Sequence, residues 1–141
     1  MLFLTVFVFL FAGIDGTPVN LCSSTSGITL DLFNINNCTS STCVVNEGAT
    51  LGILLGGTAN VDINTLKLKY TAVYVFATVI DEVLDVGDLI DVPLPAHSSF
   101  IYETQYALSD MAFYGDYVVT VQLINEIDVI LLCFKFVIRI Q

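Results

Sequence analysis

The fold class is decided by residues 133–140, which read Cys-Phe-Lys-Phe-Val-Ile-Arg-Ile. Apolar side chains fall at every second position of this stretch: Phe134, Phe136, Ile138 and Ile140 share one face, and Cys133, Lys135, Val137 and Arg139 share the other. Because successive side chains of a β-strand point to opposite faces, this period of two predicts a strand with one buried and one solvated face.

The rest of the chain also reads as strands. Tyr117, Val119, Val121 and Leu123 alternate with Val118, Thr120 and Gln122, and residues 125–128 (Asn-Glu-Ile-Asp) predict a hairpin turn before the last strand. Residues 70–80 are rich in β-branched and aromatic residues, which favour strands. Further strands are expected at 28–35, 44–55, 66–69 and 100–108. About seven short strands indicate one all-β domain, an antiparallel β-sandwich.

Breaks between these strands are indicated by glycine and proline. Gly56 and Gly57 are expected to end the apolar run that precedes them, and Pro93 and Pro95 to bracket a loop.

Composition limits what the protein can do. The 141 residues are 55% hydrophobic and 13% charged, which fits one folded domain and excludes intrinsic disorder. A formal net charge of −10 is the wrong sign for binding nucleic acid. The apolar excess means that either the core is unusually apolar or the fold encloses something apolar.

The amino terminus reads as a signal peptide. Residues 2–12 form an uninterrupted apolar run, shorter than the roughly 20 residues that a spanning helix needs. We expect residues 1–16 to be removed after Gly16, with Gly13 as the alternative site, leaving a mature domain of residues 17–141. The start of the run carries no Lys or Arg, and a buried amino-terminal strand is the competing interpretation. The predicted location is extracellular, or the lumen of an endosome, lysosome or vacuole.

Four cysteines follow the leader, and four cysteines allow three disulfide pairings. Cys38 and Cys43 flank a short polar segment that can close on itself, which leaves Cys22 to pair with Cys133. A zinc site is the alternative, although the spacing lacks paired Cys-x₂-Cys motifs.

No enzyme, metal site or cofactor is predicted. His97 is the single histidine, no Gly-x-Ser-x-Gly motif is present, and His97 is expected in an exposed loop. An acidic cluster lacks the spacing of a calcium-binding EF-hand and is interpreted as a solvated loop: Asp81, Glu82, Asp85, Asp88 and Asp91. Asn37 begins an Asn-Cys-Thr glycosylation sequon whose middle residue is a predicted disulfide cysteine.

Several of these features together resemble the ML family of lipid-recognition domains. They are Cys22, the Cys38-x₄-Cys43 pair, the segment 114–121 (Tyr-Gly-Asp-Tyr-Val-Val-Thr-Val) and the closing segment 133–138 (Cys-Phe-Lys-Phe-Val-Ile). The family includes the lysosomal Niemann–Pick type C sterol carrier, phosphatidylglycerol/phosphatidylinositol transfer proteins and group 2 mite allergens. The resemblance implies an immunoglobulin-like sandwich whose sheets splay to hold a lipid. Many members carry another short cysteine pair where residues 85–93 of this chain contain none.

Carried over by position, the resemblance implies a lipid-binding set that faces the cavity. The set is Val119, Val121, Leu123, Phe134, Phe136 and Ile138, with Phe76 from the opposite sheet and Tyr102 near the mouth. The competing interpretation is that the same residues fill an ordinary core.

The expected function is therefore binding without covalent chemistry. The chain would be a monomeric secreted or luminal carrier of a sterol, fatty acid or phospholipid, released at a membrane or to a receptor. The alternative is a secreted lipid-recognition protein of innate immunity or chemosensation that presents a lipid to a protein partner. A structural sandwich with a filled interior is the third possibility.

Overall fold

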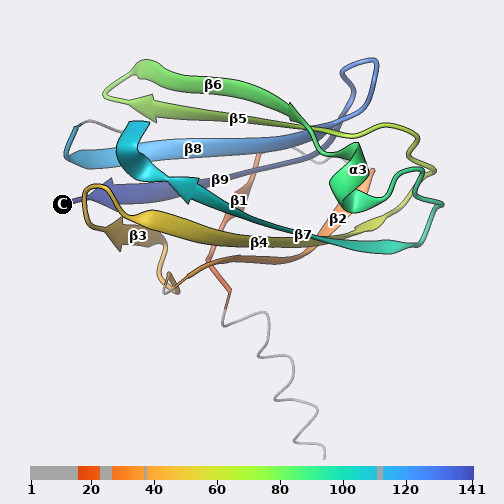
Figure 1. Ribbon diagram of the computed structural model, residues 1–141, viewed down its shortest axis with the longest axis horizontal. Helices are drawn as coiled ribbons and strands as arrows, with labels where there is room; N and C mark the ends of the chain where they lie inside the picture. The colour runs from red at the N-terminus through yellow and green to blue at the C-terminus, as the bar shows by residue number, and fades with distance from the viewer. Residues whose placement is uncertain (1–15, 23–26, 37, 111–112) are drawn as a thin grey trace, which may run out of the picture.

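The computed structural model describes residues 16–22, 27–36, 38–110 and 113–141, which form two β-sheets packed face to face (Figure 1). The larger sheet has the order β1-β9-β8-β5-β6, with β3 also paired to β9, and the smaller has the order β2-β4-β7. Residues 1–15 of the predicted signal peptide and the predicted glycosylation site Asn37 lie outside the described residues.

The elements have the following bounds. They are β1 Asn20–Leu21, β2 Ile28–Ile35, β3 Thr42–Val45, β4 Thr50–Ala59, β5 Lys67–Tyr74, β6 Ala77–Asp85, α3 Gly87–Ile90, β7 Ser99–Ala107, the 3₁₀ helix η1 Leu108–Asp110, β8 Gly115–Ile124 and β9 Ile130–Ile140. Within the described part of the chain, no helix has the length and apolar character needed to cross a membrane.

The predicted all-β sandwich is confirmed, and so is the alternation that predicted it. On β8 and β9 the residues on the inner face are buried, while Lys135 and Arg139 on the outer face of β9 are exposed. The turn at 125–128 is also present, because the Asn125 side-chain oxygen accepts hydrogen bonds from the N–H groups of Ile127 and Val129.

Tyr117 anchors the start of β8 in a way typical of immunoglobulin-like sandwiches. Its ring is fully buried, and its hydroxyl donates to the Phe113 carbonyl at 2.7 Å and accepts from the Phe113 N–H at 3.0 Å. A tyrosine that bonds to the backbone a few residues upstream is the tyrosine corner of that fold.

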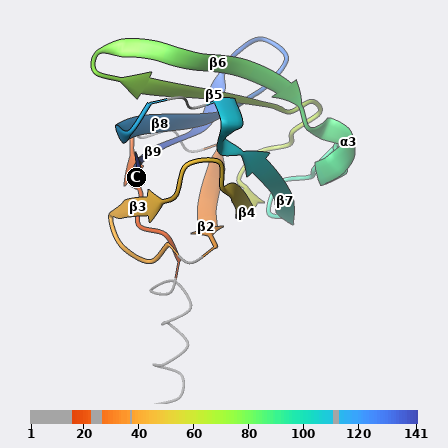
Figure 2. The same ribbon diagram turned by 60° about the vertical axis from the view of Figure 1, so that its left-hand side comes forward.

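The prediction of one strand at 44–55 was wrong. Residues 46–49 form a turn that includes Gly48 at φ 77°, and it separates β3 from β4. The two strands belong to different sheets, as Figure 2 shows.

Gly56 and Gly57 were predicted to end the apolar run. This prediction was wrong, because both residues lie inside β4. A Cβ on Gly57 would lie 2.9 Å from the Phe100 ring and 3.0 Å from Ile28. Glycine there allows close packing between neighbouring strands and does not break the strand.

The prediction of one strand at 70–80 was also wrong. Val75 and Phe76 form a two-residue turn between β5 and β6, with φ angles of 49° and 67°. Phe76 therefore lies on a turn that joins two strands of the larger sheet, not on the sheet opposite β8 and β9, and its side chain is 100% exposed. The expectation that Phe76 faces inward is thus incorrect.

The acidic cluster is solvated, as expected, but only part of it is a loop. Asp81, Glu82 and Asp85 lie on β6, Asp88 lies on α3, and Asp91 follows α3. All five side chains are exposed.

Both predicted disulfides are present. Cys22–Cys133 ties the end of β1 to β9, and Cys38–Cys43 closes a short loop before β3. Because all four cysteines are paired, the zinc alternative is excluded.

The two disulfides should differ in their effect on stability. Their sequence separations are 111 and 5 residues, and a longer closed loop removes more entropy from the unfolded chain. Replacing Cys22 and Cys133 by alanine should lower the free energy of unfolding by about 4–5 kcal/mol, and replacing Cys38 and Cys43 by about 2 kcal/mol. Urea denaturation followed by circular dichroism measures both, and an equal or reversed order would contradict this account.

Candidate functional site

A cavity of about 260 Å³ lies between the two sheets. Its wall is apolar or aromatic apart from Thr104 and Gln105. The lining residues are Phe33, Leu51, Ile53, Leu55, Leu68, Tyr70, Ala72, Ile80, Leu84, Tyr102, Thr104, Gln105, Tyr106, Val119, Val121, Phe136 and Ile138. The lining comes from both sheets, so the interior is not completely filled, which disfavours the third possibility drawn from the sequence.

One side of the cavity is closed by aromatic packing. Phe33 on β2 contacts Phe134 and Phe136 on β9, with ring centroids 4.8 and 5.0 Å apart. These contacts join the two sheets where β2 faces β9.

The opposite side lies between β6 and β7, the strands that end the two sheets. Leu84 on β6 and Gln105 on β7 line the cavity and are exposed to solvent. The cavity therefore reaches solvent between these two strands.

Tyr70 lies at this opening and contacts both a carboxylate and a second aromatic ring there. Its hydroxyl donates to Glu82 Oε1 at 2.7 Å, and its ring meets that of Tyr106 edge to face, with centroids 5.8 Å apart. Tyr70 comes from β5 and Tyr106 from β7, so the two rings meet across the gap between the sheets. The rim thus combines aromatic faces with one carboxylate.

The structure brings together five of the eight residues predicted to bind lipid. Tyr102, Val119, Val121, Phe136 and Ile138 line the cavity. Whether they contact a lipid stays a prediction.

The other three lie elsewhere. Leu123 and Phe134 are fully buried in the core but do not line the cavity, and Phe76 lies on the exposed turn. Leu123 and Phe134 have the predicted inward orientation, but both are packed into the core: each is 0% exposed, and Phe134 contacts the Phe33 ring.

Sequence reasoning missed the contribution of β2, β4 and β5. Phe33, Leu55 and Ala72 line the cavity, and all three lie in segments that were predicted as strands. The alternation of Leu51, Ile53 and Leu55 was the available signal.

A second hollow of about 300 Å³ has a different character. It lies on the outer face of the smaller sheet and is lined largely by polar side chains, among them Asn34, Asn36, Glu103 and Gln105. An apolar ligand is better matched by the interior cavity, because its wall needs no hydrogen-bond partners.

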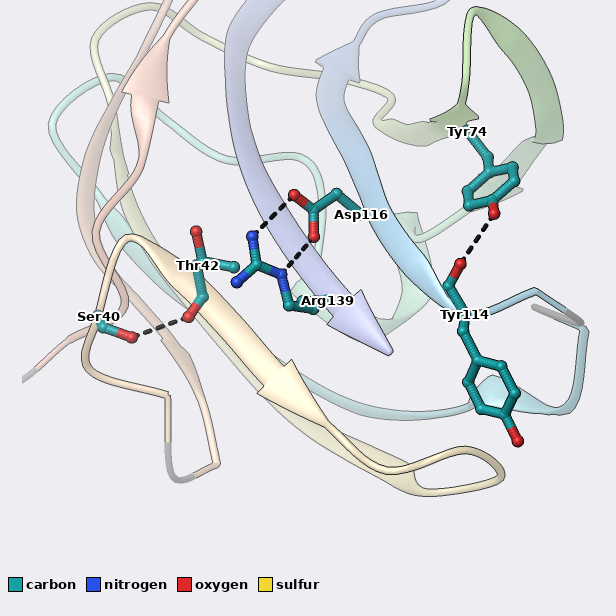
Figure 3. A network of polar contacts seen from close by, with 6 residues as sticks. All are labelled: Ser40, Thr42, Tyr74, Tyr114, Asp116 and Arg139. Atoms are coloured by element: carbon teal, nitrogen blue, oxygen red, sulfur yellow. Dashed lines mark hydrogen bonds and ion pairs between the residues drawn. The ribbon is translucent and has the colours of Figure 1, made fainter. Parts of the chain in front are cut away.

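The polar contacts on the outer face of the larger sheet are structural. Arg139 donates to both carboxylate oxygens of Asp116, at 2.6 and 3.0 Å, joining β9 to β8 (Figure 3). The hydrogen bond from Arg139 lowers the pKa of Asp116 below its usual value. Both side chains are about half exposed, so the pair adds little stability.

Other candidate chemistry finds no support in the described part of the chain. His97 lies in an exposed loop, as expected. Residues 16–22, 27–36, 38–110 and 113–141 contain no group of three His, Cys, Asp or Glu side chains placed to hold a metal ion.

Comparison with known proteins finds structures with a similar fold but no relative by sequence. No protein-family model matches the chain, and no characterised protein matches it in sequence. A Niemann-Pick type C2 protein from the Japanese carpenter ant is similar in structure, with a TM-score of 0.73 and 15% identity, covering 88% of this chain and 99% of that one. Chicken MD-1, solved in complex with lipid IVa, has a TM-score of 0.56 and 18% identity, covering 86% and 96%.

These two proteins are ML-domain proteins, so the predicted resemblance is confirmed at the level of the fold. The chain has the immunoglobulin-like sandwich that they share. The C-terminal domain of wzt is also similar, with a TM-score of 0.65, 7% identity and coverage of 84% of this chain and 76% of that one. At such identities the likeness defines the fold alone, and the function must be argued from the cavity.

Adjacent valines on β8 offer a matched test of the cavity. Val119 lines it, whereas Val118 points to the outer face of the same strand. Val119→Phe should fill part of the cavity and reduce binding of an apolar fluorescent dye about tenfold or more. The new ring would displace apolar surface of the dye about equal to one side chain, and burial of that surface contributes more than about 1.4 kcal/mol to binding.

Val118→Phe is the control and should leave dye binding unchanged. Near-ultraviolet circular dichroism verifies that both variants are folded. Equal effects of the two substitutions would mean that the dye binds outside the cavity.

Proposed function

We propose that this chain belongs to the ML family and binds a lipid acyl chain between its two sheets. The observation that carries the proposal is the apolar cavity, open between β6 and β7. An acyl chain in this cavity is stabilised by roughly 25 cal/mol for each Å² of apolar surface removed from water. The similarity to MD-1, solved with lipid IVa, supports a lipid as the ligand.

The size of the cavity favours a slender ligand. Its volume of about 260 Å³ lies just below the roughly 300–1,000 Å³ usual for small-molecule pockets. Of the expected ligands, an unbranched acyl chain is the narrowest and matches this volume best. A fused-ring sterol needs more width, so β6 and β7 would have to separate before it could bind.

The rim favours a headgroup without net negative charge. Glu82, bonded to Tyr70, places a carboxylate at the opening, and Gln105 offers an amide donor and acceptor. A headgroup carrying hydroxyl or ammonium groups can donate to Glu82, whereas a phosphate monoester is repelled. A neutral or zwitterionic lipid is therefore the proposed ligand.

The protein acts by binding and release, without a covalent step. Two disulfides suit an oxidising compartment. With the predicted signal peptide, they support secretion or delivery to a lumen. Extracellular transport of a lipid between membranes is the activity that fits these properties.

Native mass spectrometry of protein secreted from eukaryotic cells tests this function. The expected result is a bound lipid with one or two acyl chains, at up to one molecule per chain, which organic extraction then identifies. Val119→Phe should emerge without it, and Val118→Phe should retain it.

Three results would contradict the proposal. Protein that is free of lipid and also fails to bind added lysophosphatidylcholine and phosphatidylcholine would indicate a cavity without this role. A co-purified sterol would overturn the argument from cavity size. Lipid that is bound but moves between vesicles only when a protein partner is added would favour lipid presentation over transport.

A further inference from the structure

The end of the sandwich where β5 turns into β6 exposes large apolar side chains. Val75 and Phe76 on the turn are 69% and 100% exposed, and Phe113 and Tyr114, just before β8, are 57% and 60% exposed. We call these four residues the apolar tip. Fully exposed phenylalanine is unfavourable in water, so a cluster of this kind marks an interaction surface.

Tyr74 holds the two parts of the apolar tip together. Its ring stacks on Phe113 with centroids 5.4 Å apart, and its hydroxyl donates to the Tyr114 carbonyl at 2.8 Å (Figure 3). Gly115, at φ 122°, allows this approach, because a Cβ there would lie 3.2 Å from the Tyr74 ring. The turn and the segment before β8 therefore form one surface.

The sequence Val75-Phe76 is poorly suited to the turn that it forms. Both central residues have positive φ, at 49° for Val75 and 67° for Phe76, as in a type I′ turn. Such turns favour Asn-Gly, and a β-branched residue with positive φ is a conformational outlier. Folding alone does not explain Val-Phe here, and strained positions of this kind are often functional.

Charge is distributed unevenly along the molecule. Residues 70–80 carry none, and near the apolar tip Asp116 is paired with Arg139 while Glu47 accepts a hydrogen bond from Tyr114. The opposite end, with α3 and the β8–β9 turn, carries exposed carboxylates (Figure 1). They are Asp62, Asp88, Asp91, Glu126 and Asp128.

We propose that the apolar tip inserts into the surface of a zwitterionic phospholipid membrane, so that the protein docks end-on with its acidic end in water. Aromatic side chains are favoured at the membrane–water interface. With a net charge of −10, the protein would be repelled by anionic lipid, which selects a neutral surface.

This docking mode rests on the proposed function, because it brings the cavity close to the lipid that it loads. Ala72 and Ile80 line the cavity and are paired with each other on β5 and β6, directly behind the turn. The strand pair that carries the apolar tip therefore also forms a wall of the cavity.

The chain contains no tryptophan, so a single substitution supplies a clean probe. On addition of phosphatidylcholine vesicles, Phe76→Trp should show a blue-shifted emission that brominated lipid quenches. Ile127→Trp is the matched control, because Ile127 is 72% exposed on the β8–β9 turn at the acidic end. Its emission should not change, and a response from both probes, or from neither, would overturn end-on docking.

A second pair of variants separates docking from folding. Val75→Asn with Phe76→Gly gives the turn its preferred sequence and should raise the melting temperature, while vesicle binding falls about tenfold or more with the loss of the phenylalanine. Ile127→Ser should leave vesicle binding unchanged. Vesicle binding retained in the Asn-Gly variant would contradict the proposal.

Lipid occupancy, measured by native mass spectrometry, distinguishes the two proposals. If the protein carries a bound lipid but the emission of Phe76→Trp does not change on addition of vesicles, docking is refuted and lipid binding still stands. A responsive probe on protein that never binds lipid would support docking and refute the carrier function. A probe that responds only to a protein partner or to self-association would likewise overturn the membrane assignment.

Discussion

The packing of Phe33 against Phe134 and Phe136 is the contact on which the rest of the structure depends. It joins the smaller sheet to the larger along the β2–β9 side, with ring centroids 4.8 and 5.0 Å apart. The Cys22–Cys133 disulfide lies beside it, since Leu21 is paired with Phe134. With this side fixed, the sheets can part toward β6 and β7 and still remain one domain.

An open interior has a thermodynamic consequence. Side chains around an empty apolar cavity lose the dispersion contacts that a filled core would give them. A ligand that fills the cavity restores these contacts and stabilises the folded state in proportion to the logarithm of its concentration over Kd. Lipid binding and fold stability are therefore linked, and the mouth between the two terminal strands is where exchange must occur.

The sequence predicts the elements whose two faces differ in polarity. β8 and β9 were recognised because lysine, arginine and threonine alternate with buried apolar residues. The β5–β6 turn could not be predicted, since residues 70–80 are uncharged and Val-Phe is not a turn sequence. Gly57 was misread for a related reason, because its close contact with Phe100 involves a neighbouring strand.

The cavity was predicted only in part, because an inward-facing residue lines it only where the side chains packed around that residue leave space. Leu123 and Val121 share a face, yet only Val121 lines the cavity. The opposing wall comes from β4 and β7, whose register against the larger sheet is a tertiary property. Local sequence patterns contain no information on that register.

Nuclear Overhauser contacts between the ¹³C-labelled acyl chain of lysophosphatidylcholine and the methyl groups of the protein test the central claim most directly. The account predicts contacts from the acyl chain to Leu55 on one sheet and to Val121 on the other in the same complex. Contacts restricted to outward-facing methyl groups, such as those of Val118 or Ile101, would contradict it, because the ligand would then lie on the surface and not between the sheets.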